Sequence, residues 1–203
     1  MFKNTYKNKK VLVTGNTGFK GSWLSIWLQQ LGADVYGISH DIPTDPSIFE
    51  VCKLSSKMTH KFIDIRDFDA LEKEIKQIQP NFIFHLAAQP IVSTSYQNPL
   101  ETFSTNVLGS AHILEAVRKA DLEVNVIMIT SDKCYENVEW TWGYRENDQM
   151  GGKDPYSASK GAAEIVIRSF YHSFFNSFNS KIKLVSVRAG IVSGGGDWAE
   201  NRI

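Results

Sequence analysis

The sequence of 203 residues has little cysteine and no recognisable set of metal ligands. Cys52 and Cys134 lie far apart with no CxxC pair, and the five histidines are scattered without the spacing of a metal site. We therefore expect neither a disulfide nor a bound metal. A reducing, cytoplasmic setting fits this composition.

The sequence also lacks an excess of charge and a long apolar run. Lysine plus arginine equals aspartate plus glutamate at 22 each, so bulk charge favours neither nucleic acid nor an anionic membrane as a partner. The apolar run after the basic residues 1–10 ends at Thr14, too early for a signal peptide or a membrane span. We expect a small-molecule partner and no contact with nucleic acid or membrane.

What the sequence does have is a glycine-rich turn between a strand pattern and a helix pattern. An apolar run, Val11 to Val13, precedes Gly15, and Gly18 and Gly21 complete a Gly-x-x-Gly-x-x-Gly spacing. Glycine lets a backbone turn sharply and approach a ligand, while the start of a helix favours a phosphate. The pattern predicts a pyrophosphate-binding loop. An ordinary tight turn is the alternative, but the flanking strand and helix favour the binding loop.

Strand and helix patterns alternate along the rest of the chain. Further strands are predicted at 34–39, 62–65, 81–88, 124–130 and 184–188, and helices at 19–31, 47–54, 68–78, 99–120 and 156–178. The first helix has its large apolar residues on one face: Phe19, Trp23, Ile26, Trp27 and Leu31. We predict one α/β domain, a doubly wound parallel sheet of the Rossmann type with flanking helices.

The end of the strand at 34–39 bears on the choice of cofactor. An acidic residue at this place usually binds the adenosine ribose, whereas a nearby arginine accommodates a 2′-phosphate. The sequence reads Ser39-His40-Asp41, with no arginine and with no acid at the last strand residue. These residues favour NAD over NADP.

Tyr156 and Lys160 are four residues apart, on one face of a predicted helix. A tyrosine acts as a base near neutral pH only if its pKa falls from about 10 by roughly three units. A lysine ammonium and an oxidised nicotinamide both favour the phenolate. Such a pair is common by chance, but its place behind a dinucleotide loop favours catalysis.

Ser131, Asp132 and Lys133 follow the strand at 124–130 directly. They lie at its C-terminal end, at the sheet edge where ligands bind in open α/β folds. A helix cap or turn is the plain alternative. The triplet offers a hydroxyl, a carboxyl and an amine together. The polar and aromatic segment that follows, 131–155, is too long for a simple connection and is predicted to be functional.

Several motifs together resemble the extended short-chain dehydrogenase/reductase superfamily. They are Thr14-Gly-x-x-Gly-x-x-Gly21, His85-Leu-Ala-Ala88, Thr105-Asn-Val-x-Gly109 and Tyr156-x-x-x-Lys160. Within it, four further stretches resemble the CDP-glucose 4,6-dehydratase family: Thr130 to Tyr135, Glu139 to Glu146, Met150 to Gly152 and Gly194 to Trp198. The resemblance covers essentially the whole chain.

The resemblance implies an internal redox reaction on CDP-glucose with NAD. Tyr156 takes the proton of the sugar 4-hydroxyl while hydride passes from C4 to NAD, and Lys160 holds the nicotinamide ribose. Lys133, which needs a lowered pKa, then removes the C5 proton as Asp132 protonates the departing 6-hydroxyl. Hydride returns to C6, giving a 4-keto-6-deoxy sugar.

The same resemblance implies the residues of each site. The catalytic residues are Ser131, Asp132, Lys133, Tyr156 and Lys160. The cofactor residues are Gly15, Asn16, Thr17, Gly18, Phe19, Lys20, Gly21, Ser39, Asp64, Ile65, Leu86, Ala87, Ala88, Gln89, Thr105, Thr130, Tyr156 and Lys160, with Asn106 supporting the lysine. The substrate residues are Gln89, Ser131, Trp142, Tyr144 and Arg145.

Two departures from the family pattern affect the substrate side. After Arg188 the family has Arg-x-x-Asn, whereas this chain has Ile191, which cannot make the same hydrogen bond. The family also continues beyond the equivalent of Ile203 into a substrate-binding domain. We therefore expect a truncated chain that keeps the cofactor domain, has little of the substrate site and is not fully active alone.

Rival interpretations remain for the function. One is another nucleotide-sugar dehydratase or an epimerase. The other is a non-catalytic module that binds NAD or a partner, in which the aromatic residues of 170–178 face a partner helix. A homo-oligomer formed through the helices at 99–120 and 156–178 is also expected.

Overall fold

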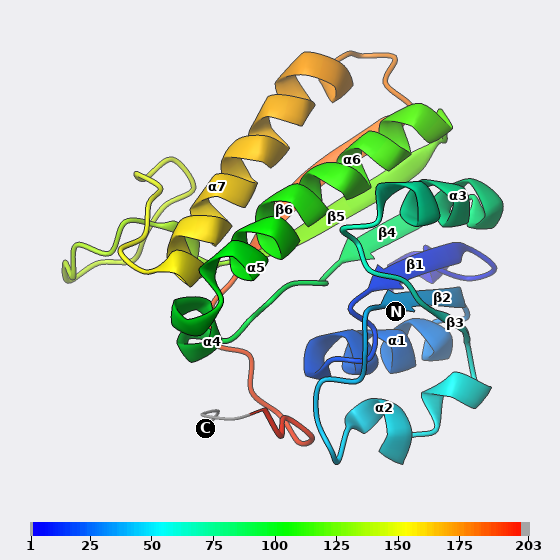
Figure 1. Cartoon of the computed structure of the whole chain (residues 1–203). Helices are drawn as coiled ribbons and strands as arrows, with labels where there is room; N and C mark the ends of the chain where they lie inside the picture. Colours follow the sequence, from blue (N-terminus) through cyan, green and yellow to red (C-terminus); the bar gives the residue numbers. More distant parts are fainter. Residues whose placement is uncertain (1, 200–203) are drawn as a thin grey trace.

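Six parallel strands form the centre of the molecule in the computed structural model, which describes residues 2–199 (Figure 1). They are β1 (Lys10–Thr14), β2 (Asp34–Ser39), β3 (Thr59–Phe62), β4 (Phe82–His85), β5 (Val124–Ser131) and β6 (Ile182–Ala189). Their order, β3-β2-β1-β4-β5-β6, confirms the predicted doubly wound sheet. The order reverses between β1 and β4, and ligands bind such sheets beyond the carboxyl ends of the strands at that point.

The helices cover both faces of this sheet. They are α1 (Phe19–Gln30), α2 (Ile48–Val51), α3 (Phe68–Ile78), α4 (Val92–Gln97), α5 (Pro99–Phe103), α6 (Gly109–Ala120) and α7 (Pro155–Phe170). Short 3-10 segments occur at Phe2–Asn4, Leu54–Ser56 and Asp132–Cys134, and π-helical segments at Ser104–Leu108 and Tyr171–Phe175. Figure 1 shows α3, α6 and α7 on one face, and α1 and α2 on the other. Among residues 2–199, no helix is both long enough and apolar enough to cross a membrane.

The core has two parts because side chains alternate between the two faces of each strand. Leu12 of β1 belongs to the larger part, with Leu71 of α3 and Leu114 of α6. Val11 and Val13 point to the other face and pack in a smaller cluster with Leu28 of α1. The central strands are thus buried on both faces, as expected of a parallel sheet.

The large apolar residues predicted on one face of the first helix do not form its buried face. Trp23 and Trp27 are 48% and 44% exposed. The buried residues of α1 include Gly21, Ser22 and Ser25. Small side chains allow the helix to lie close to β1 and the glycine loop, so close approach takes precedence over the burial of large apolar groups.

Several predicted boundaries were also wrong. The third strand lies at Thr59–Phe62, not 62–65, and the fourth ends at His85. Residues 99–120 are not one α-helix, because a π-helical segment separates α5 from α6. Residues 176–178 lie beyond the helical part of 156–178, and α4 had not been predicted. In the aromatic group of 170–178, Phe175 is buried in the core, whereas Phe178 is fully exposed.

Candidate active site

The glycine loop joins β1 to α1 at the point where the strand order reverses. Gly15 has a φ of +72°, and a Cβ there would lie 2.8 Å from the backbone nitrogen of Ala87. A Cβ at Gly21 would collide with the carbonyl oxygen of Gly15. At Gly18, in contrast, a Cβ would lie 3.5 Å from the same oxygen, which is an ordinary contact. Gly15 and Gly21 are therefore required by packing and backbone conformation, whereas Gly18 is not.

Gly18 is also the N-cap residue of α1. It provides no side-chain cap, and no acidic residue lies in the first turn of the helix. The first N–H groups of α1 are therefore available to an anion, which the helix dipole also favours.

The polar side chains of the loop are bonded to β2 and β3. Asn16 accepts a hydrogen bond from Ser39 (2.8 Å) and lies 3.2 Å from Nδ1 of His60. Its amide occupies the place that a Cβ of Gly37 would take. Thr17 donates its hydroxyl to the carbonyl of Asp41 at 2.6 Å. Asn16, Thr17 and Ser39 thus fix the shape of the loop.

Two lysines face the same space from opposite sides of the sheet's carboxyl edge. Lys160 of α7 is buried, and this burial, with the charge of Lys20 in the first turn of α1, lowers its pKa to about 8. Its ammonium nitrogen lies 5.9 Å from the centre of the Tyr156 ring. Tyr156, Lys160 and the start of α1 therefore surround one positively charged region.

The start of α7 explains the position of Tyr156. Asp154 caps the helix by accepting hydrogen bonds from the backbone N–H (2.9 Å) and the hydroxyl (2.6 Å) of Ser157. Pro155 is the first helical residue, where its lack of an N–H costs nothing. These signals fix Tyr156 in the first turn.

Ser131, Asp132 and Lys133 lie where β5 ends, against α7. The hydroxyl of Ser131 caps the short 3-10 turn, accepting from the Lys133 N–H (3.2 Å), and donates to Asp132 (3.1 Å). The ammonium of Lys133 is 3.2 Å from Asp132, with both side chains partly exposed. A Cβ on Gly161 of α7 would come within 3.3 Å of the Cys134 carbonyl. The structure therefore brings this triplet next to the helix turn that contains Lys160.

The segment after this triplet is an aromatic loop. The rings of Tyr135 and Tyr144 stack at 5.2 Å, and Trp140 contacts both Tyr144 and Trp142. Trp142 is 65% exposed, and Arg145 is also exposed. Figure 1 shows this loop projecting beside the first turns of α7, on the side away from α1. Three of the five predicted substrate residues, Trp142, Tyr144 and Arg145, thus lie together in this loop.

The predicted cofactor residues after β4 form a tightly bonded turn. The side chain of Asn106 accepts from the Gln89 N–H (2.8 Å) and donates to the Gln89 carbonyl (3.1 Å). The Gln89 side chain donates to Thr102 (2.8 Å), and Asn106 also donates to Ser159 (2.8 Å). Asn106 therefore reaches α7 through Ser159. Leu86, Ala87 and Ala88 are half-buried in this turn, and Thr105 is half-buried beside Asn106.

At the other end of the site, Asp64 and Ile65 follow β3. Ile65 is buried against Gly109, where a Cβ would collide with its side chain. The Arg66 side chain donates hydrogen bonds to the carboxylate of Asp64 and holds its pKa below the ordinary value. Asp64 is thus ionised at neutral pH.

Comparison with known proteins identifies the family. Residues 12–183 match the family model described as GDP-mannose 4,6 dehydratase. The chain belongs to the GDP-mannose 4,6 dehydratase family.

Relatives within and around this family confirm the resemblance seen in the motifs. The chain is 54% identical to CDP-glucose 4,6-dehydratase of Salmonella typhimurium over 99% of its own length and 57% of the relative's. It is 32% identical to CDP-paratose 2-epimerase of Salmonella typhi, over 81% of this chain and 54% of that one. The chain spans about half the length of the curated relatives it matches.

A solved structure supports the same fold assignment. The structure of UDP-glucose 4-epimerase from Thermus thermophilus in complex with NAD matches with a TM-score of 0.75 and 27% identity. The match covers 88% of this chain and 54% of the epimerase. The architecture of this member of the GDP-mannose 4,6 dehydratase family is therefore shared with an NAD-bound epimerase.

A buried ion pair between Glu164 and Arg188 was not predicted from the sequence of this family member. Glu164 of α7 accepts hydrogen bonds from Thr130, from Ser186 (3.1 Å) and from Arg188 (3.0 Å). Thr130 therefore directs its hydroxyl to α7. Arg188 also donates to the Tyr135 hydroxyl at 2.7 Å. Although burial opposes its charge, the bonds to Glu164 and Tyr135 raise the Arg188 pKa. The sequence did contain a signal, since Glu164 follows Lys160 by four residues and therefore lies on the same face of the predicted helix.

His85 at the end of β4 was also not assigned a role. Its Nδ1 lies 2.8 Å from the Thr14 hydroxyl and its Nε2 3.3 Å from that of Ser110. Burial, with the charge of Lys160, lowers its pKa to about 3. A neutral imidazole therefore links β1, β4 and α6 beneath the site.

Proposed function

We propose that the chain is the cofactor-binding and catalytic part of a nucleotide-sugar 4,6-dehydratase that acts on CDP-glucose. The observation that carries this proposal is the identity of 54% to a CDP-glucose 4,6-dehydratase over 99% of the chain. The dTDP-glucose and GDP-mannose dehydratases that match 80–96% of the chain are only 26–29% identical. The difference favours CDP-glucose among the nucleotide sugars.

The glycine loop fits a dinucleotide. Its backbone is held open by Gly15, Gly18 and Gly21, and the start of α1 and Lys20 supply positive charge for a pyrophosphate. The residues proposed to hold NAD are the loop, Asp64 and Ile65 at the adenine, residues 86–89, Thr105 and Thr130 along the groove, and Tyr156 with Lys160 at the nicotinamide. Bound NAD supplies a reversible hydride acceptor.

Tyr156 and Lys160 have roles at the sugar 4-hydroxyl. The phenolate of Tyr156 takes the hydroxyl proton as C4 is oxidised, and the Lys160 ammonium stabilises the phenolate. The 5.9 Å between this ammonium and the centre of the ring supports such a role. Ser131 lies at the same strand end and orients the substrate.

The ion pair of Asp132 and Lys133 suits the elimination of water. A proton that moves from Lys133 to Asp132 across their 3.2 Å contact gives a neutral amine and a protonated carboxyl together. The amine then removes the C5 proton, and the carboxyl protonates the departing 6-hydroxyl, which leaves as water. Both groups return to the ion pair at the end of the step, so no external acid or base is consumed.

The proposal also covers the oligomeric state of the protein. A homo-oligomer formed through α5, α7 and the π-helical segment between α5 and α6 fits the exposed apolar side chains there, among them Leu100, Leu108 and Ile165.

The proposed setting is the cytoplasm, where free thiols such as Cys52 and Cys134 are stable. Trp142, Tyr144 and Arg145 border the sugar nucleotide in this proposal.

Separate titrations of NAD and CDP-glucose test the function. We expect NAD to bind and CDP-glucose to be converted without steady release of NADH, with slow turnover because the chain is not expected to be fully active alone. Turnover of GDP- or dTDP-sugars instead would assign another dehydratase or an epimerase. Lys133→Met should stop elimination while some NADH forms, whereas Lys153→Met, an exposed lysine near the same loop, should leave turnover unchanged. Binding of NAD without binding or turnover of CDP-glucose would favour a non-catalytic module.

A further inference from the structure

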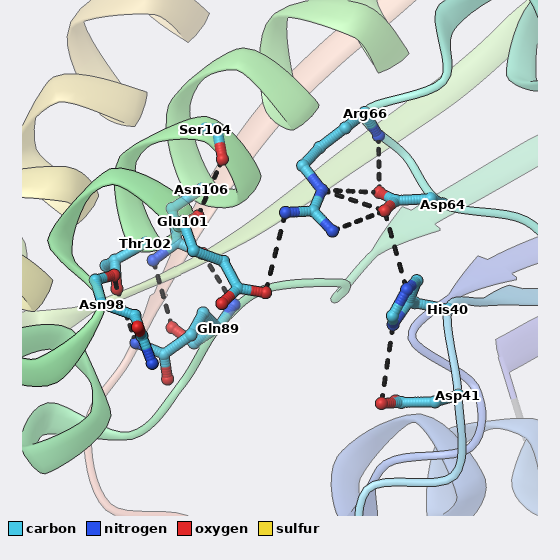
Figure 2. Close-up of polar contacts among 10 residues, drawn as sticks. All are labelled: His40, Asp41, Asp64, Arg66, Gln89, Asn98, Glu101, Thr102, Ser104 and Asn106. Carbon is cyan, nitrogen blue, oxygen red and sulfur yellow. Dashed lines mark hydrogen bonds and ion pairs between the residues drawn. The ribbon is translucent and has the colours of Figure 1, made fainter.

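Arg66 lies at the carboxyl edge of the sheet, where the sequence suggested that no arginine was available. It follows β3, and its guanidinium meets the carboxylate of Asp64 through Nε (3.0 Å to Oδ1) and Nη2 (2.6 Å to Oδ2). Its Nη1 lies 3.6 Å from Oε1 of Glu101 on α5. Figure 2 shows the guanidinium extended between these two carboxylates, which come from different elements.

The same cluster reaches the end of β2. Nε2 of His40, the residue after β2, lies 3.8 Å from the Asp64 carboxylate, and Nδ1 of His40 lies 3.5 Å from that of Asp41 (Figure 2). Arg66 and His40 therefore contact the same carboxylate. The end of this strand is where doubly wound folds read the adenosine ribose: an acid accepts from the 2′-hydroxyl of NAD, and an arginine binds the 2′-phosphate of NADP.

The negative charges of this cluster disfavour the 2′-phosphate of NADP. The bond to Arg66 keeps the pKa of Asp64 below its ordinary value, so the carboxylate stays ionised. Arg66, whose pKa is raised chiefly by its bond to Asp64, is held by Asp64 and Glu101. Asp41 adds a further negative charge that is 68% exposed.

We propose that Asp64 and Glu101 sequester Arg66 and thereby make the adenosine end of the site select NAD over NADP. Arg66 is then the specificity-determining residue, since release from its two carboxylates turns it toward a 2′-phosphate. This inference rests on the proposed binding of a nicotinamide dinucleotide. It adds to that proposal a mechanism by which the two cofactors are distinguished.

The test is the ratio of the dissociation constants of NADP and NAD, measured by calorimetry on the full chain. The ratio cancels the adenine, pyrophosphate and nicotinamide contacts, which the two cofactors share, so it isolates the 2′-phosphate even where Asp64 also contacts the adenine. We expect Glu101→Gln to lower the ratio about threefold, as for removal of one partly exposed charge contact. Asp64→Asn should lower it about tenfold, because Arg66 donates two parallel hydrogen bonds to this carboxylate. Higher salt should shrink both effects by screening.

A second substitution and a matched control assign the effect to Arg66. Arg66→Gln combined with Asp64→Asn should restore the preference for NAD, because the released cation is then absent. Glu115→Gln removes a carboxylate from a comparable pair with Arg118 on α6 and should leave the ratio unchanged.

The outcomes separate this inference from the proposed function. If the wild-type chain binds neither cofactor, the proposed function fails. If it binds NAD but the ratio in Asp64→Asn and Glu101→Gln equals that in Glu115→Gln, the function stands and the role of Arg66 is wrong. A wild-type preference for NADP, or a gain in NADP affinity that persists without Arg66, would also overturn it.

Discussion

Lys160 is the residue at which stability and function oppose one another most directly. A buried ammonium loses its hydration, and this burial together with the charge of Lys20 lowers the Lys160 pKa to about 8, although Glu164 opposes the shift. The same positive charge is what the proposed mechanism needs beside Tyr156. Burial of the Lys160 ammonium therefore lowers the stability of the fold, and a bound cofactor and the Tyr156 phenolate would reduce this loss.

Lys160→Met should stabilise the cofactor-free protein at pH 7. The fall from 10.5 to about 8 corresponds to about 3 kcal/mol of lost stability, and after allowance for imperfect packing we expect a gain of about 1–3 kcal/mol. The penalty is complete below about pH 8, because the lysine is then charged in both states, and it disappears as pH rises to 10.5.

Urea denaturation of both proteins at several pH values measures this difference. The advantage of the methionine variant should be constant between pH 6 and about pH 8 and should then decline to nothing near pH 10.5. The affinity of the variant for NAD should be lower than that of the wild type. A variant less stable than wild type at pH 7 would show that Lys160 makes favourable contacts that outweigh its burial.

At the scale of elements, different glycines of the β1–α1 turn serve the packing of the fold and the binding of the ligand. Gly21 has no room for a methyl group, whereas Gly18 has ordinary contact distance and a φ of −73°. Gly21→Ala should therefore destabilise the fold by about 2 kcal/mol or more through backbone collision. Gly18→Ala should cost less than about 1 kcal/mol yet weaken NAD binding by narrowing the space before α1. Thermal melting and NAD titration of the pair distinguish the roles; equal losses of stability would refute the assignment.

The pair of Glu164 and Arg188 couples three elements: α7, β6 and the aromatic loop. Arg188→Leu leaves a carboxylate that is 3% exposed without its partner, so we expect a loss of about 3 kcal/mol. Arg118→Leu breaks the more exposed pair with Glu115 and removes the guanidinium over the Phe174 ring, and it should have a much smaller effect on stability. Chemical denaturation compares the two. If both variants were equally stable, Thr130 and Ser186 alone would satisfy the buried carboxylate.

The elements differ in how much of them the sequence could predict. The helix at Phe68–Ile78 and the strand at Asp34–Ser39 were predicted at their observed bounds, because local periodicity and capping determine them. The face of α1 was not predicted, since close approach to β1 depends on the neighbouring strands. The place of Arg66 was not predicted for the same reason. Arg66 comes near the end of β2 only because β3 pairs with β2. The spacing of Tyr156 and Lys160 could be predicted because it is local to one helix.

The whole molecule presents an apolar surface on the side of the sheet that α5, α6 and α7 cover. α7 contacts both α5 and α6, and Leu108 of the adjoining π-helical segment and Ile165 of α7 are 56% and 63% exposed. Apolar groups on adjacent helices suit an isologous contact, in which the same surface of two chains meets about a two-fold axis.

We therefore expect the protein to dimerise through this surface, with Ile165→Glu shifting the equilibrium to monomer. A charge placed in an apolar contact loses hydration without gaining a partner, so dissociation should increase by at least about tenfold. Val51→Glu is the matched control, because Val51 is also 63% exposed but belongs to α2 on the opposite face. Sedimentation velocity over a concentration series measures both. A wild-type protein that stays monomeric throughout, or equal dissociation by the two variants, would exclude α5, α6 and α7 as the interface.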